Sequence, residues 1–212
     1  EEVRRVVSKA PVKQYEAKYT PLSRSAARMA LEEAVLAIVG HTLSKSAMCV
    51  LMAQSALETG GFQKMANFNW GGIKYSPGYD FASWKTTEGF GDTETRIVAK
   101  FRAYPDAVTG AKDFVRFLAN SPRYAKAWKE LEAGDPIKYA FALGAAGYFT
   151  ADPTQYAKGV AREWAWCGLD MMSYGHTPEE VKRFQKAHPE AGNADGLLGP
   201  MTRKAIKNAL GD

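Results

Sequence analysis

Apolar residues recur every three or four positions over most of the chain, the spacing of helices that bury one face. In residues 24–39 this pattern is preceded by Ser23, a capping residue type, and followed by Gly40, which favours a helix end. Residues 44–58 repeat the pattern and stop before a glycine pair. A further helix is predicted to follow Pro105 and Asp106, where apolar residues from Val108 to Leu118 have helical spacing, and shorter helices are predicted at about 123–133, 136–146 and 153–166.

The helical period is interrupted once. Residues 60–82 are rich in glycine and predicted to be mostly loop, and residues 84–104 alternate between apolar and polar side chains around a turn at Gly91 and Asp92. The predicted fold class is therefore α+β and mainly α, a helical domain with a small β-hairpin lobe.

Polar and proline-containing stretches divide the chain into four parts. We expect an N-terminal arm or linker at 1–22, one helical domain with its hairpin at 23–168, a linker at 169–177, and a small helical unit at 178–212.

Composition excludes several classes of protein. The 212 residues are 46% hydrophobic and 24% charged, typical of a globular protein, and no apolar run approaches the length of a membrane span. The net charge of +5 favours anionic partners, but the cations are spread out and no nucleic-acid-binding motif accompanies them, so we expect no nucleic acid partner. Two cysteines and three histidines predict no metal site, and no cofactor is called for. Cys49 is expected to be a buried thiol, with a bridge to Cys167 left open.

Glu58 is the first candidate for chemistry. It lies seven residues after Leu51, so it shares the apolar face of its helix, and it stands at the helix C-terminus. Burial and the negative end of the helix dipole both raise the pKa of a carboxyl group, and a general acid at neutral pH needs a raised pKa. The alternative is a surface glutamate at a frayed helix end. The asparagine- and aromatic-rich stretch 67–74 that follows is of the kind that binds sugars, which favours the first interpretation.

Five stretches around Glu58 carry a resemblance to a known family. They occur in the family's order and at similar spacings: residues 53–61 with 69–74, 86–88, 99–105, 121–124, and 146–153 with Tyr156 and Ala157. Over about residues 30–165 the chain resembles the bacterial peptidoglycan glucosaminidases of glycoside hydrolase family 73, which include flagellar rod-assembly wall hydrolases. The resemblance implies a lysozyme-like fold with a sugar cleft between the helices and the β lobe.

The resemblance also implies roles for individual residues. Glu58 matches the family's catalytic acid, and Glu88 the second carboxylate, placed across the cleft as a base acting through water or as a charge stabiliser. Asn69 matches a loop asparagine, and Tyr148 and Tyr156 match tyrosines that line the cleft. Asp92 and Glu94 on the same hairpin are the alternatives to Glu88.

Trp70 is assigned as a residue that stacks on sugar, with core packing as the alternative. The chain departs from the family pattern at Phe62, where a tryptophan is usual, at Gly71, where a phenylalanine is usual, and at Gly89, where an aromatic residue is usual. These departures affect the sugar subsites more than the chemistry.

The C-terminal stretch 181–206 resembles a peptidoglycan-binding domain, with a tight turn at Asp195 and Gly196 and with Thr202 expected to cap the last helix. Because only about 35 residues are available, such a unit either binds the wall or packs on the catalytic domain without binding.

Taken together, the sequence predicts a peptidoglycan hydrolase that cleaves β-1,4 bonds of the glycan strand as an N-acetylglucosaminidase. The alternatives are a muramidase or a lytic transglycosylase on the same polymer, and, in another class, a non-catalytic wall-binding module. The expected site of action is the periplasm or cell wall. We expect the chain to be processed or excised from a larger secreted, flagellar, phage or secretion-system protein, and an inhibitor or immunity protein is a candidate partner.

Overall fold

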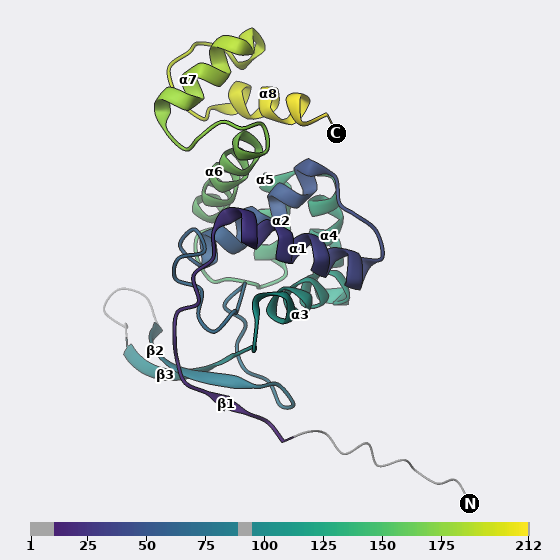
Figure 1. Cartoon of the computed structure of the whole chain (residues 1–212), viewed down its shortest axis with the longest axis vertical. Helices are drawn as coiled ribbons and strands as arrows, with labels where there is room; N and C mark the ends of the chain where they lie inside the picture. The colour runs from purple at the N-terminus through teal and green to yellow at the C-terminus, as the bar shows by residue number, and fades with distance from the viewer. Residues whose placement is uncertain (1–10, 89–94, 212) are drawn as a thin grey trace, which may run out of the picture.

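The computed structural model describes residues 11–88 and 95–211, apart from the side chains of residues 87, 88, 95 and 96. Its described part is mainly helical, with a small three-stranded sheet at one end (Figure 1). The elements are β1 (Gln14–Tyr15), α1 (Arg24–Val39), α2 (Lys45–Glu58), β2 (Phe81–Glu88), β3 (Thr95–Arg102), α3 (Ala107–Ala119), α4 (Ala125–Glu132), α5 (Pro136–Ala145), α6 (Pro153–Met171), α7 (Pro178–Ala187) and α8 (Pro200–Leu210). The predicted fold class is confirmed.

Helix α2 forms the centre of the molecule. All its residues from Ser46 to Ala56 are buried, and it packs most extensively against α6. A helix that is enclosed on all sides has an apolar sequence around its whole circumference, and this explains the nearly continuous apolar run before Glu58. The last residue of this rigid central helix is therefore held in a fixed place.

Local sequence signals set most helix ends. The Ser23 hydroxyl accepts a hydrogen bond from the Ala26 amide, and Gly40 ends α1 in the left-handed conformation with φ +87°. Asp106 and Asp135 cap α3 and α5 in the same way. The helix ends predicted at Ser23 and Gly40 are confirmed.

The sheet has the order β1-β2-β3, with β1 parallel to β2 and β2 antiparallel to β3. The predicted hairpin is confirmed in its strands, while its turn at Gly91 and Asp92 lies outside the described residues. Residues 11–22, predicted as part of an arm or linker, run along the β lobe and supply β1 (Figure 1). This segment is therefore an arm that contributes one strand to the sheet of the β lobe.

The C-terminal helices are joined to the rest by α6, which extends to Met171 and so passes the predicted domain end at residue 168. Helix α8 packs on α6, where Gly168 allows close approach: a Cβ atom there would lie 2.5 Å from Cγ2 of Ile206. The core of the small unit, which includes Phe184 and Ile206, is continuous with the main core.

The sequence predicted that Thr202 caps α8, and this prediction is wrong. Gly199 stands at the N-cap, and the buried Thr202 hydroxyl lies among Gln185, Ala191 and Leu197. The hydroxyl satisfies buried polar groups between the two helices instead, because it lies three residues inside the helix.

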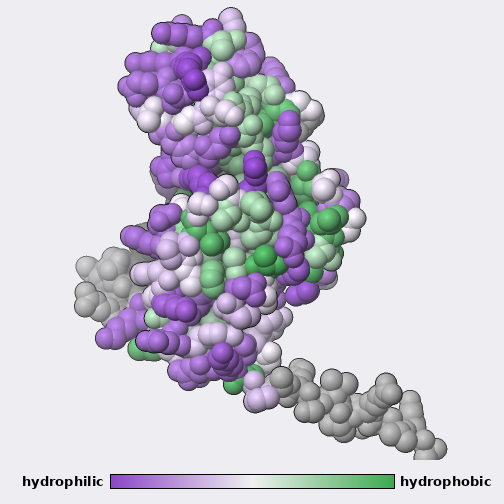
Figure 2. All heavy atoms as spheres, in the orientation of Figure 1, coloured by the Kyte–Doolittle hydropathy of each residue, from purple (hydrophilic) through white to green (hydrophobic). Residues whose placement is uncertain are grey.

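Both cysteine thiols are buried and lie against methionine sulfurs at 3.7 Å, Cys49 against Met171 and Cys167 against Met52. The bridge that the sequence left open is not formed. Figure 2 shows apolar side chains gathered over α1, where Met29 and Leu36 are exposed, whereas the C-terminal unit presents mostly polar residues on this face. In the described residues no helix has both the length and the apolar content needed to cross a membrane.

Candidate active site

Glu58 is the last residue of α2, and the chain turns sharply after it. The Thr59 hydroxyl donates to the Ser55 carbonyl at 2.6 Å, and the Gly61 amide donates to the Ala56 carbonyl at 2.7 Å. Gly60 and Gly61 have φ of +57° and +66°, which glycine adopts without steric cost. The turn leaves the Glu58 carboxyl at an open end of the helix, in contact with solvent.

The loop after this turn passes beside the carboxyl. The Asn69 side chain donates to the carbonyls of Ile73 and Arg102, both at 2.9 Å, and accepts from the Ile73 amide at 2.8 Å. The Ser55 hydroxyl donates to the Trp70 carbonyl at 2.6 Å and so ties the loop to α2. Gly72 then lies so close to the acid that a Cβ atom would be 4.0 Å from Oε2 of Glu58.

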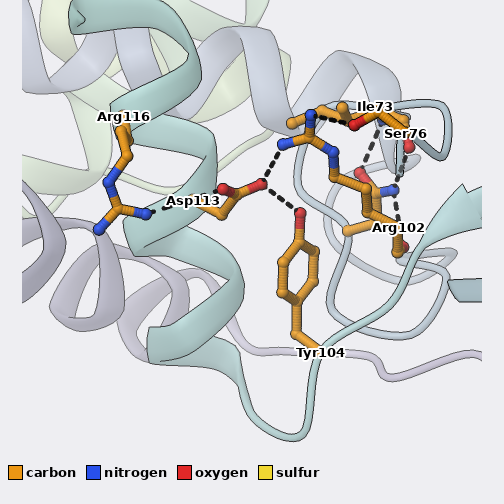
Figure 3. Close-up of polar contacts among 7 residues, drawn as sticks. Ile73, Ser76, Arg102, Tyr104, Asp113 and Arg116 are labelled. Carbon is orange, nitrogen blue, oxygen red and sulfur yellow. Dashed lines mark hydrogen bonds and ion pairs between the residues drawn. The ribbon is translucent and has the colours of Figure 1, made fainter. Parts of the chain in front are cut away.

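A buried ion pair anchors the same loop to α3 (Figure 3). Arg102, at the end of β3, donates from Nη1 to Oδ2 of Asp113 at 2.7 Å and from Nη2 to the Ser76 hydroxyl at 2.9 Å. The Tyr104 hydroxyl donates to the same Asp113 oxygen at 2.6 Å, while Arg116 lies 3.7 Å from the other oxygen. Burial lowers the pKa of Arg102, but the hydrogen bond and the charge of Asp113 outweigh it, so the net shift is upward and the guanidinium stays charged.

Two tyrosines from the helical side complete the surroundings of the acid. The Tyr156 hydroxyl, on α6, donates to Oε1 of Glu58 at 2.8 Å, and its ring stacks on Phe149 with centroids 3.8 Å apart. The Tyr148 hydroxyl donates to the Gly71 carbonyl at 2.8 Å. Tyr156 therefore contacts Glu58 directly, and Tyr148 contacts the loop beside it.

The Gly71 position explains one departure from the family pattern. A Cβ atom there would lie 2.4 Å from the Tyr148 hydroxyl and 2.6 Å from Cε2 of Phe114. A larger side chain has no space at this position, because the two rings already fill it.

Two pockets meet at Gly72. The first, of about 200 Å³, contains Glu58 and is bordered by the β lobe; the second, of about 370 Å³, lies on the helical side. The first is lined by Tyr19, Glu58, Thr59, Lys64, Ala66, Asn69, Gly72, Trp84, Lys85, Thr86 and Phe101. The second is lined by Gly71, Gly72, Ile73, Lys74, Ser76, Arg102, Phe117, Tyr124 and Tyr148. Gly72 is common to both pockets and lies beside the acid.

The pocket shifts the titration of its ionisable groups. Desolvation raises the pKa of Glu58, and the hydrogen bond from Tyr156 lowers it in part, so the net direction is upward as predicted. The carboxyl is solvent-accessible, yet protein surrounds it on most sides, which favours its neutral form. Burial and the nearby Glu58 charge raise the pKa of Tyr148 and Tyr156, so both hydroxyls remain protonated donors.

Trp70 does not have the role predicted for it. Its side chain is fully buried against Phe62, and Nε1 donates to the Ala107 carbonyl at 3.0 Å. Both ring faces are covered by the core, so Trp70 holds the loop in place and offers no surface to sugar. Asn69 lines the pocket, but both its donated bonds go to backbone carbonyls, which makes it a loop-positioning residue.

Glu88 is the last residue of β2, two positions after Thr86, which lines the Glu58 pocket. Its side chain and all of Asp92 and Glu94 lie outside the described residues. Among the described residues no group of three or more histidine, cysteine, aspartate or glutamate side chains is arranged to hold a metal ion.

Three residues near the site were not identified from the sequence: Gln54, its partner Tyr139, and Tyr19. Gln54, one turn before Glu58, is fully buried and accepts a hydrogen bond from the buried Tyr139 hydroxyl. A glutamine in an otherwise apolar helical stripe was the available signal. Tyr19 lines the Glu58 pocket from the segment interpreted as an arm, and its polar surroundings gave no signal.

An accessible carboxyl whose pKa is raised by burial, beside two adjoining pockets in a mainly helical fold with a β lobe, is the arrangement expected of a glycoside hydrolase cleft. Residues 41–165 match the family described as mannosyl-glycoprotein endo-beta-N-acetylglucosaminidase. The chain belongs to this glucosaminidase family.

The chain is also similar to two curated relatives and to one solved structure. The peptidoglycan hydrolase FlgJ of Vibrio cholerae is 34% identical over 142 residues, which are 63% of this chain and 41% of that protein. FlgJ of Pseudomonas aeruginosa is 32% identical over 157 residues, 67% of this chain and 38% of that protein. The chain thus spans about two fifths of the length of these relatives. The solved glycoside hydrolase domain of Salmonella typhimurium FlgJ is 25% identical, with a TM-score of 0.47, over 78% of this chain and 97% of that one.

Proposed function

We propose that this chain hydrolyses β-1,4 glycosidic bonds of bacterial peptidoglycan as an N-acetylglucosaminidase, with Glu58 as the general acid. The observation that carries the proposal is the Glu58 carboxyl, which has a raised pKa and stands beside the junction of two pockets in a chain of the glucosaminidase family. The names of the relatives, peptidoglycan hydrolases, supply the substrate class.

The hydrogen bond from Tyr156 supports a direction for proton transfer. Because the Tyr156 hydroxyl donates to Oε1 of Glu58, the proton of the neutral carboxyl resides on Oε2. Oε2 is the Glu58 oxygen that would lie 4.0 Å from a Cβ atom on Gly72, where the two pockets meet. In this proposal Glu58 protonates the leaving glycosidic oxygen of a strand that crosses Gly72, as general acid catalysis requires.

Glu88 is the proposed second carboxylate, either as the base that activates water or as a stabiliser of positive charge on the sugar ring. The support is its position in β2, the strand that borders the Glu58 pocket through Trp84 and Thr86. If Glu88 has this role, Glu88→Gln lowers turnover strongly while Asp92→Asn and Glu94→Gln leave it near the wild-type value. A loss confined to the Asp92 or Glu94 variant would move the role to that residue.

The lysines around the cleft fit an anionic polymer. Lys64 and Lys85 line the first pocket and Lys74 the second, and the stem peptides of peptidoglycan carry carboxylates. The wall or the periplasm is therefore the proposed site of action.

The C-terminal unit is proposed as an additional wall contact. Since α8 packs against α6, this contact has a fixed orientation relative to the cleft instead of a flexible tether. Sedimentation of the chain with insoluble peptidoglycan, compared with a chain truncated before residue 178, tests this contact. Equal sedimentation of the two folded chains would contradict it.

The product ends test which bond is cut. Purified peptidoglycan is digested with the wild type, the products are reduced with borohydride, and their termini are identified by mass spectrometry. Reduced N-acetylglucosamine ends are the expected result. Reduced muramic acid ends would make the protein a muramidase, anhydro ends a lytic transglycosylase, and no soluble product from folded protein would favour the wall-binding module.

A further inference from the structure

The segment before α1 is fastened to the wall of the Glu58 pocket by one buried asparagine. Asn67 is 1% exposed; its side chain donates to the Glu16 carbonyl at 2.8 Å and accepts from the Lys18 amide at 3.2 Å. Its backbone amide donates to the Lys18 carbonyl at 3.0 Å. Three hydrogen bonds from one residue fix the backbone immediately before Tyr19.

A second clamp fixes the backbone on the other side of Tyr19. The Thr20 amide donates to the Met65 carbonyl at 2.7 Å, and the Thr20 hydroxyl accepts from the Phe68 amide at 2.8 Å. Tyr19 itself forms an isolated antiparallel bridge with Ala66. The residue is held on both flanks, so the fold fixes the backbone position from which its side chain projects.

The Tyr19 side chain is nevertheless exposed to solvent. Tyr19 is 57% exposed, with its ring against Trp84 at a centroid distance of 5.0 Å and an interplanar angle of 41°. Nε1 of Trp84 donates to Oδ1 of Asn67 at 3.2 Å, so the same asparagine holds both parts of the pair. Both rings line the pocket that contains Glu58.

We infer that Tyr19, supported by Trp84, is a sugar-stacking residue, and that the N-terminal segment is therefore part of the substrate site. The inference rests on the proposed glycosidase function and deepens it, since it assigns one pyranose ring of the glycan strand to this wall of the pocket. Tyr19 lies outside the residues that match the family, 41–165, so neither the family match nor the motifs assign it.

The physical basis is the match between a clamped aromatic face and the C–H face of a sugar ring. An exposed aromatic ring gains by covering apolar surface, and a clamped ring loses little conformational entropy when it does so. Lys64 and Lys85 on the same pocket are placed to meet anionic substituents of the strand. Aromatic, cationic and carboxyl groups thus line one pocket of about 200 Å³.

The test measures binding apart from turnover. In a Glu58→Gln background, which prevents cleavage, the dissociation constant is measured by calorimetry for soluble glycan strands freed of their stem peptides. Tyr19→Ala is expected to weaken binding about fivefold or more, and Tyr19→Phe less than about twofold because the ring is kept. Phe141→Ala removes a comparably exposed ring, 46% exposed on α5 and outside both cleft pockets, and is expected to change nothing.

With Glu58 intact, Tyr19→Ala is expected to raise KM and leave kcat near the wild-type value, because the ring binds substrate without touching the reacting atoms. Unchanged binding in folded Tyr19→Ala, equal effects of Tyr19→Ala and Phe141→Ala, or no binding of glycan strands by the Glu58→Gln protein would overturn the inference. The two proposals can fail separately. If cleavage depends on Glu58 but binding does not depend on Tyr19, only the inference about Tyr19 is wrong. If binding depends on Tyr19 but the wild type cleaves nothing, only the proposed hydrolase function is wrong.

Discussion

Replacing Asp113 by alanine is expected to destabilise the fold strongly, because Asp113 neutralises a cation that the β lobe buries. Both side chains of the pair are nearly enclosed, Arg102 at 9% and Asp113 at 8% exposure. Without the carboxylate, Arg102 keeps the Ser76 hydroxyl as a partner but remains an uncompensated buried charge, and the Tyr104 hydroxyl loses its acceptor. Removing one member of a buried pair costs about 3–5 kcal/mol, and that is the loss we expect in the free energy of unfolding.

Two further variants calibrate this value. Asp113→Asn keeps the volume and an oxygen that accepts from both Arg102 and Tyr104 but removes the charge, so its loss is expected at about 1.5–3 kcal/mol. Arg116→Ala removes a contact of 3.7 Å from a side chain that is 51% exposed, so its loss is expected below about 1 kcal/mol.

Urea unfolding monitored by circular dichroism measures all three variants. The Arg102 carbonyl accepts a hydrogen bond from the Asn69 side chain, which positions the loop beside Glu58. Asp113→Ala is therefore also expected to lower activity at temperatures where the variant is still folded. An Asp113→Ala loss below about 1 kcal/mol, or one equal to that of Arg116→Ala, would refute the reasoning.

Three other changes test separate parts of the structure. Gly71→Ala places a Cβ atom 2.4 Å from the Tyr148 hydroxyl, so we expect a stability loss of about 1–3 kcal/mol and a displaced loop with lower activity; unchanged activity would contradict this. Burial raises the pKa of Glu58, so the folded state binds the carboxyl proton more tightly than the unfolded state does. The contribution of Glu58 to the free energy of unfolding is therefore fully present below the ordinary pKa of 4.5 and is lost as the pH rises through the folded-state pKa. Glu58→Gln should therefore melt higher than the wild type at about pH 8 and similarly at about pH 4, and a lower melting temperature at pH 8 would count against it. Gly168→Val forces α8 away from α6 at Ile206, so trypsin should release the C-terminal helices sooner, whereas unchanged cleavage would show that the unit does not depend on this contact.

Features encoded within a few residues could be predicted from the sequence. Ser23 caps its helix through an amide three residues later, and the glycine pair after Glu58 ends α2 by local backbone geometry. Glu58 itself could be found because a carboxylate on an apolar helical face is unusual wherever the helix packs. Tyr148 and Tyr156 were found only through the family resemblance, since nothing local distinguishes them from core tyrosines.

Features that depend on distant contacts could not be predicted. Trp70 lies in a loop whose glycines and asparagines look the same whether its ring is exposed or buried, and only contacts with Phe62 and the Ala107 carbonyl decide the outcome. Tyr19 lies in a polar stretch that resembles a linker, and it becomes part of the pocket because Asn67, almost fifty residues later, holds its backbone neighbours.

The most direct test of the central claim compares the wild type and Glu58→Gln in the release of soluble fragments from purified peptidoglycan. Circular dichroism first establishes that both proteins are folded. The account predicts that Glu58→Gln releases fragments at least about a hundredfold more slowly, because the amide has no proton to give to the leaving oxygen. Glu163→Gln, which alters a glutamate paired with Arg24 and outside both cleft pockets, should retain the wild-type rate. Full activity of Glu58→Gln would contradict the assignment of Glu58 as the catalytic acid.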